Sequence, residues 1–259
     1  YLNLWLPSPK LTMALLHSFE NSGNWLFKRR GQIPVFLFLM AIPAVYFARF
    51  NYVNHWMNHF INYFAVLLSV LGFVVRAYTI GTTPRGTSGR NTENQVAESL
   101  NTSGIYSVVR HPLYLGNYLM WIGIVVYTHN ISFVIIVSLM YWLYYERIMF
   151  AEERFLERKF GQTYLDWSLQ VPAFLPKWSS FRKSTIPFSL KSVLRREYSG
   201  VLATVIGFVY VEILMGWFRY QTFTIGNKFI YVLIASVVIT LVLRTLKHNT
   251  KILSEEGRS

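Results

Sequence analysis

The chain has 259 residues, of which 53% are hydrophobic, 17% aromatic and only 14% charged. This composition is too apolar for an ordinary soluble domain of this length and predicts a membrane protein. The formal net charge is +13. Because the basic residues flank apolar segments, we expect them to face anionic membrane lipids, and we expect no nucleic-acid partner. Cysteine is absent, which excludes disulfides and cysteine-ligated metals, and we expect no metal site.

Six apolar segments approach the roughly 20 residues that a helix needs to cross the hydrocarbon core of a membrane. The sequence therefore predicts an all-α fold, a polytopic transmembrane helical bundle with about six spans. The third and fourth spans are joined so closely that we expect a helical hairpin. The expected spans are residues 33–50, 61–80, 113–128, 130–149, 199–218 and 227–245.

Lysine and arginine alternate between the segments that join these spans. They are frequent before the first span, in the 81–112 segment, in the 147–198 segment and in the C-terminal tail, and absent between the third and fourth spans. The positive-inside rule therefore places both termini and these two long segments in the cytoplasm. No cleavable signal peptide is evident, so we expect the N-terminus to be retained. We expect a bacterial inner (cytoplasmic) membrane protein.

The most distinctive local pattern is RHPLYLG at residues 110–116, where the polar 81–112 segment enters the third span. Pro112 in the first helical turn costs no hydrogen bond, so it holds Arg110 and His111 at the membrane surface. The pattern is consistent with an ordinary helix start with a snorkelling arginine. It is also consistent with a site that combines a cation and a titratable ring, although the pattern alone favours the ordinary helix start.

Two adjacent carboxylates, Glu152 and Glu153, follow the fourth span. One interpretation is a solvated helix face, on which Glu153 and Glu157 pair with nearby basic residues at helical spacing. The other is an anchor for a cationic ligand such as the ammonium group of an amino acid. Because the third and fourth spans form a hairpin, we expect His111 and Glu152 to be neighbours.

These residues resemble the signatures of the isoprenylcysteine carboxyl methyltransferase and phospholipid methyltransferase superfamily, Arg-His-Pro-x-Tyr and then Glu-Glu. The likeness continues in EERFLERKFGQTYLDW and VPAFLP, and it covers about residues 70–178. Ala173 departs from the pattern, because relatives often have a basic or polar residue there. Substrate specificity is therefore not transferred from the resemblance.

The resemblance implies an integral membrane methyltransferase that uses S-adenosylmethionine (S-adenosyl-L-methionine). Its acceptor would be a lipid or lipid-linked phosphate, carboxylate or amine at the cytoplasmic face. Together with the predicted spans, the resemblance divides the chain into three parts. These are an N-terminal cytoplasmic segment (1–32), a membrane methyltransferase core with a cytoplasmic cofactor-binding cap (33–198), and an additional transmembrane hairpin with a cytoplasmic tail (199–259). The implied cofactor-binding residues are His111, Pro112, Tyr114, Leu115, Gly116, Glu152 and Glu153.

Methyl transfer from a sulfonium is an in-line displacement that needs alignment and a dry site. An anionic acceptor needs no general base and would be held by cations, whereas an amine would give its proton to a carboxylate or to His111. Arg76, within or near the second span, either lines the passage for a lipid head group, pairs with another residue, or snorkels to the interface. The candidate catalytic residues are Arg147, Arg110 and Glu153, and the candidate substrate-binding residues are Arg76, Arg85 and Arg90.

Two other functions stay open. A membrane reductase of the sterol-reductase type would use NADPH, although the chain is short for that class. A non-enzymatic scaffold or transporter would need polar residues that face one another across several spans, whereas here they cluster at one hairpin end. Glycines in the polar 81–109 segment also suggest a lid over the cofactor. The oligomeric state is not predicted.

Overall fold

The computed structural model describes residues 9–48, 54–84, 86–87, 95–223 and 225–258. Within these ranges the chain is helical, and its only extended pairing is one bridge between Gly104 and Arg182. The predicted all-α bundle is confirmed. The helices are α1 (Pro9–Arg29), α2 (Ile33–Ala48), α3 (His55–Gly81), α4 (Pro112–Val126), α5 (Ile131–Phe160), α6 (Gln162–Ser168), α7 (Leu190–Tyr220) and α8 (Asn227–Asn249), with short 3-10 turns at Ile105–Ser107 and Trp178–Ser180.

Each of the six expected apolar segments is a helix. Helices α3, α5, α7 and α8 are long and apolar enough to cross a membrane, whereas the apolar parts of α2 and α4 are shorter. Helix α5 runs to Phe160 and α7 begins at Leu190, so the expected domain boundary at 198–199 falls inside α7. The helices outrun the expected spans because their polar turns stay helical, and Ser189 caps α7 by accepting a hydrogen bond from the Ser192 amide.

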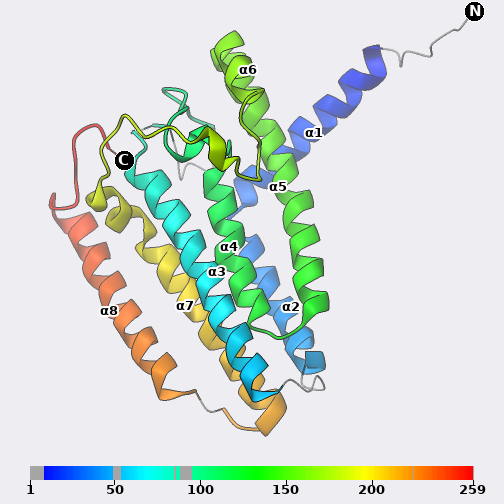
Figure 1. Ribbon diagram of the computed structural model, residues 1–259, viewed down its shortest axis with the longest axis vertical. Coiled ribbons are helices and arrows are strands. Elements are labelled where there is room, and N and C mark those ends of the chain that lie inside the picture. Colours follow the sequence, from blue (N-terminus) through cyan, green and yellow to red (C-terminus); the bar gives the residue numbers. More distant parts are fainter. Residues whose placement is uncertain (1–8, 49–53, 85, 88–94, 224, 259) are drawn as a thin grey trace, which may run out of the picture.

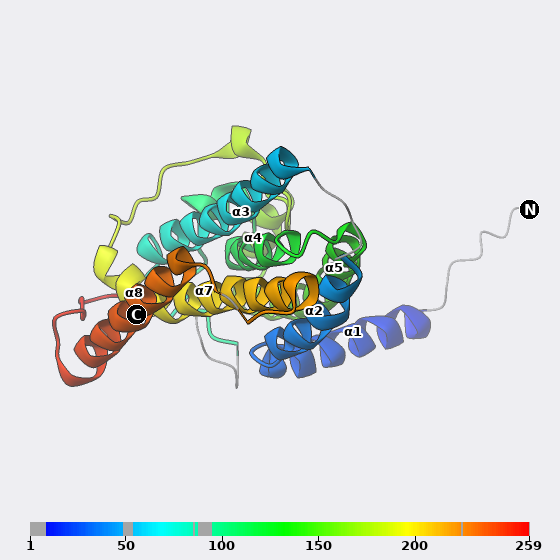
Figure 2. The same cartoon turned by 90° about the horizontal axis from the view of Figure 1, so that it is seen from below.

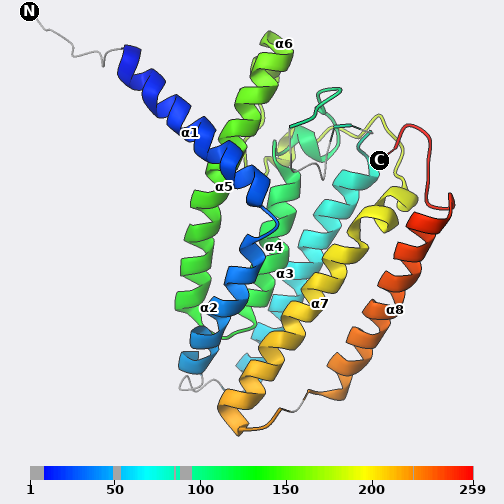
Figure 3. The same cartoon turned by 180° about the vertical axis from the view of Figure 1, so that it is seen from behind.

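The six apolar helices alternate in direction along the bundle (Figure 1). The start of α4 therefore lies at the same end as the ends of α3, α5 and α8, together with the polar segments 82–111 and 161–189. We call this the site end. Helix α1 extends outward from it and packs against the C-terminal part of α5 (Figure 3).

Helix α4 lies at the centre of the bundle, surrounded by α3, α5 and α7 (Figure 2). Glycines let it approach α3 closely. A Cβ atom added at Gly72 of α3 would lie 2.5 Å from the carbonyl oxygen of Gly116, and one added at Gly123 would lie 2.5 Å from the carbonyl oxygen of Ala65. Small residues of this kind are what close helix packing in a membrane requires.

Helix α7 packs against α2, α3 and α4, and α8 packs mainly on α7. A buried ion pair joins α7 to α3: Arg76 donates from Nε and Nη2 to the two carboxylate oxygens of Glu197, at 2.7 and 2.6 Å. Its Nη1 donates to Oδ1 of Asn117 on α4 at 2.5 Å. Of the interpretations of Arg76, pairing is therefore the one that the structure confirms.

Candidate functional site

The entrance to α4 is held in place by the later VPAFLP segment. The backbone amide of Arg110 donates to the carbonyl of Pro172 at 2.9 Å, and the amide of His111 donates to the carbonyl of Ala173 at 3.2 Å. Pro112 then begins the helix. The two sequence motifs, about sixty residues apart, are thus parts of one structure that fixes the side chains of Arg110 and His111.

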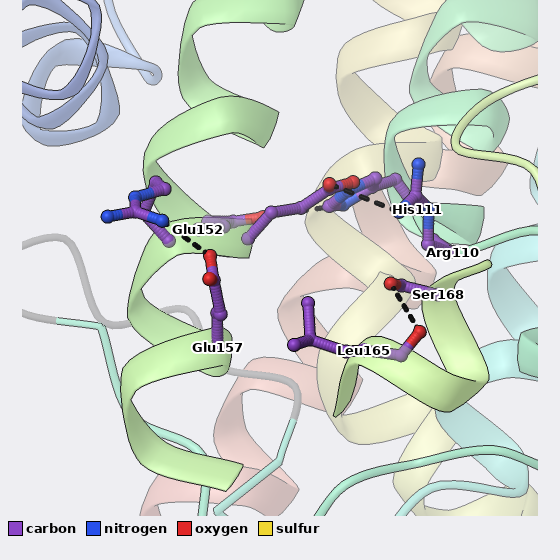
Figure 4. Close-up of polar contacts among 8 residues, drawn as sticks. Arg110, His111, Glu152, Glu157, Leu165 and Ser168 are labelled. Carbon is purple, nitrogen blue, oxygen red and sulfur yellow. Dashed lines mark hydrogen bonds and ion pairs between the residues drawn. The ribbon is translucent and has the colours of Figure 1, made fainter. Parts of the chain in front are cut away.

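These two side chains meet α5 at its paired carboxylates. Nε2 of His111 lies 2.9 Å from Oε1 of Glu153, and Nδ1 lies 3.6 Å from Oε2 of Glu152. Arg110 Nη1 lies 3.2 Å from Oε2 of Glu153, and the Tyr114 hydroxyl donates to Oε1 of Glu152 at 2.6 Å. Figure 4 shows Arg110 and His111 turned toward α5 at Glu152. The expected contact between His111 and Glu152 is confirmed.

His111 is only 7% exposed. Burial by itself would lower its pKa, but the hydrogen bonds and charges of Glu152 and Glu153 outweigh burial and raise the pKa of the imidazole above its ordinary value. The imidazolium form is therefore favoured between the two carboxylates. Burial and the nearby charge of Glu152 also raise the pKa of Tyr106, so its hydroxyl stays protonated.

A cavity opens beside this cluster at the site end. Its walls combine the cluster with aromatic rings and with part of the polar segment that precedes α4. The side chains that matter most to its chemistry are Arg30, Tyr106, Arg110, His111, Tyr114, Glu152 and Trp167, and residues 95–97 and 99–101 form a further wall. The cavity therefore offers one carboxylate, several cations and aromatic faces to a ligand.

The structure does not bring every candidate residue to this cavity. Leu115 is buried in the apolar core, and Gly116 faces α3. The guanidinium of Arg147 lies over the ring of Phe19, 3.5 Å from its centroid, and so packs against α1. Arg76 pairs with Glu197 deeper in the bundle. Arg85 and Arg90 lie outside the described residues.

Arg30, Tyr106 and Trp167 are among the cavity residues that were not identified from the sequence. Arg30, between α1 and α2, has its Nη1 4.0 Å from Oε1 of Glu152. Because it follows Lys28 and Arg29, it was interpreted only as one of the basic residues that indicate the orientation of the chain in the membrane. Tyr106 lies in a polar segment without helical periodicity, so no spacing rule pointed to it. Among the described residues, no group of three or more His, Asp or Glu side chains is arranged to hold a metal ion.

Comparison with known proteins shows what the central part of the chain is similar to. Residues 60–163 match the phospholipid methyltransferase family. The chain is 31% identical over 109 residues to protein-S-isoprenylcysteine O-methyltransferase B of Arabidopsis thaliana, covering 41% of this chain and 55% of the relative. It is 28% identical over 114 residues to the protein-S-isoprenylcysteine O-methyltransferase of Schizosaccharomyces pombe, covering 42% and 48%. The resemblance to this membrane methyltransferase superfamily is thereby confirmed for the central part of the chain.

A third relative is named for a different role. The chain is 35% identical over 86 residues to the nickel-cobalt-cadmium resistance protein NccN of Alcaligenes xylosoxydans xylosoxydans, covering 33% of this chain and 40% of the relative. The matches thus span between two fifths and just over half of the relatives' lengths. The family match leaves α1, α2, α7 and α8 outside it. No solved structure matches the chain.

Proposed function

We propose that this protein is an integral membrane methyltransferase that transfers the methyl group of S-adenosylmethionine to a lipid or lipid-linked head group. We place the site end and both termini at the cytoplasmic face of a bacterial inner membrane, as the distribution of basic residues favours. The observation that carries the proposal is the position of Glu152, whose carboxylate faces a cavity with aromatic walls at the end of the α4–α5 hairpin.

The residues around the cavity fit this cofactor. Its ammonium and sulfonium groups are both cationic, and they suit a carboxylate and aromatic faces. Arg110 and His111 already lie against Glu153, so Glu152 is the carboxylate that is best placed for the ammonium group. Arg30 also lines the cavity, with its Nη1 4.0 Å from Oε1 of Glu152.

The cofactor supplies an electrophilic methyl group, and the protein's task is to align the acceptor and exclude water. Arg30 and Arg110 both line the cavity, which favours a phosphate or carboxylate acceptor over an amine. Such an acceptor needs no general base, since its oxygen is already anionic. An amine acceptor would instead need a base, and His111 does not suit that role because its imidazolium form is favoured.

Calorimetric titration of the detergent-purified protein with S-adenosylmethionine and its demethylated product tests the proposal. We expect Glu152→Gln to weaken binding of S-adenosylmethionine by about tenfold or more, because a charge-assisted hydrogen bond is lost. Glu157→Gln is the matched control. Glu157 lies on the same helix, but it pairs with Arg154 at 2.6 Å and does not line the cavity. Equal losses in both variants, or no binding to folded wild type in native lipid, would overturn the proposal.

A further inference from the structure

A second cavity lies deeper in the bundle, between α2, α4 and α7, with a volume of about 240 Å³. Its walls are mainly apolar. Its lining residues on α4 run from Asn117 to Ile124, which is roughly 10 Å along a helix axis. Toward the deeper end, Phe38 of α2 and Tyr210 of α7 pack ring against ring with centroids 5.1 Å apart, and the Tyr210 hydroxyl donates to the Phe38 carbonyl at 2.9 Å. The cavity is therefore elongated along the bundle.

The cavity is one of three neighbouring spaces that lead toward the site described above. A smaller cavity of about 80 Å³ lies between α2, α4 and α5, and Leu37 and Trp121 line both of these apolar spaces. Arg30 lines both the smaller cavity and the cavity at the site end. The three spaces therefore share the side chains of Leu37, Trp121 and Arg30, and side chains change rotamer far more readily than a helix backbone moves.

The charges around this second cavity do not favour a charged occupant. Among the described residues, Arg76 is the only charged one in its lining. Both carboxylate oxygens of Glu197 pair with it, and Asn117 accepts a third hydrogen bond. The cation is therefore neutralised within the protein, and the remaining walls offer apolar surface. An elongated apolar space parallel to the bundle suits a hydrocarbon chain.

We propose that this cavity holds a hydrocarbon chain of the acceptor lipid while its head group lies near Arg30 in the site-end cavity. The inference rests on the proposed function. It gives α7, which lies outside the region matched to the family, a direct part in substrate binding, because Gly200, Ala203, Thr204 and Gly207 line one wall. Ala203 is also exposed at the bundle surface, so this wall is where a chain would enter from the bilayer.

Photolabelling tests the assignment. The probe is palmitic acid with a diazirine midway along its chain, added to the detergent-purified full chain, and labelled peptides are mapped by mass spectrometry. We expect saturable labelling of the peptides that contain Trp121 and Tyr210. Ala203→Leu, which fills the cavity, should reduce that labelling about tenfold. The matched control is Ala235→Leu on the exposed face of α8, which should leave it unchanged.

Cofactor binding measured on the same samples separates the two proposals. Unsaturable labelling, or labelling spread evenly over α8, with S-adenosylmethionine still bound would overturn the chain site and leave the proposed function standing. Saturable labelling without cofactor binding would overturn the proposed function, and with it the assignment to an acceptor. If Ala203→Leu does not elute as a single folded species, Gly200→Leu replaces it, since a Cβ atom there meets nothing closer than 3.7 Å.

Discussion

At the scale of single residues, Glu152 and Glu153 are adjacent in sequence but have different surroundings. Successive side chains on a helix point about 100° apart. Glu153 therefore lies closest to Arg110 and His111, whereas Glu152, 3.6 Å from Nδ1 of His111, also meets the Tyr114 hydroxyl and the cavity. One carboxylate thus fixes the entrance to α4, and the other is left to bind a ligand. Because of this division, we expect Glu152→Gln to affect mainly ligand binding and Glu153→Gln to affect mainly the entrance to α4.

The raised pKa of His111 predicts a pH-dependent stability. The folded state favours the imidazolium form, so its contribution is complete below the ordinary histidine pKa of about 6.5. It is lost as the pH rises through the higher folded-state pKa. We expect the melting temperature in detergent to fall by a few degrees over that interval, and His111→Gln to flatten this dependence.

His248→Gln is the matched control for this titration, because His248 is an exposed histidine at the end of α8. It should keep the wild-type slope. If the His111→Gln profile ran parallel to that of the wild type, the ion pairs between His111 and the two carboxylates would not stabilise the fold.

The sequence was sufficient to predict that His111 and Glu152 are neighbours, because a short turn forces the ends of a hairpin together. It was not sufficient to say which side of α4 each motif residue faces. Leu115 and Gly116 directly follow Tyr114, yet they turn into the core and toward α3. Arg30 was missed because its partner Glu152 is more than a hundred residues away, and no local periodicity encodes such a contact.

At the scale of helices, the closest approach is that of α3 to α4, and it depends on glycine. We expect Gly72→Ala to lower the melting temperature by several degrees, because the new Cβ would lie 2.5 Å from the Gly116 carbonyl oxygen and 2.6 Å from the Met120 amide nitrogen. Neither backbone atom can move without shifting α4. Gly31→Ala, where a Cβ meets nothing within 4 Å, should melt as the wild type does, and equal melting of both variants would contradict this packing.

Hydropathy predicted the six apolar helices because each carries a long lipid-compatible surface. It did not predict where α5 and α7 end, since their polar turns continue as helix at the site end. Nor did it predict which spans would pair. The ion pair between Arg76 and Glu197 joins residues 121 positions apart, and only the assembled bundle shows that α7 neutralises a cation of α3.

At the scale of the whole molecule, polar connections and both described ends of the chain gather at the site end. The C-terminal tail docks there too: Arg258 donates to the carbonyls of Gly81, at 3.2 Å, and Thr83, at 3.3 Å. The tail therefore contacts the end of α3, from which the polar segment leading to α4 departs. In a membrane, such an arrangement opens the cavity with Glu152 to the water on only one face of the bilayer.

This asymmetry predicts which positions can be labelled from outside the cell. The test is simple because the chain has no native cysteine. We expect Gln221→Cys, in the exposed α7–α8 connection, to react in intact cells with a maleimide that cannot cross the inner membrane. Ser254→Cys, exposed in the C-terminal tail, should react only after the cells are opened. The end of α7, which Gln221 follows, and the C-terminal end of the chain lie at opposite ends of the bundle (Figure 1), so one result constrains the other. The reverse pattern would place Glu152 outside the cytoplasm, where S-adenosylmethionine made in the cell could not reach it, and would refute the proposed orientation together with the cofactor assignment.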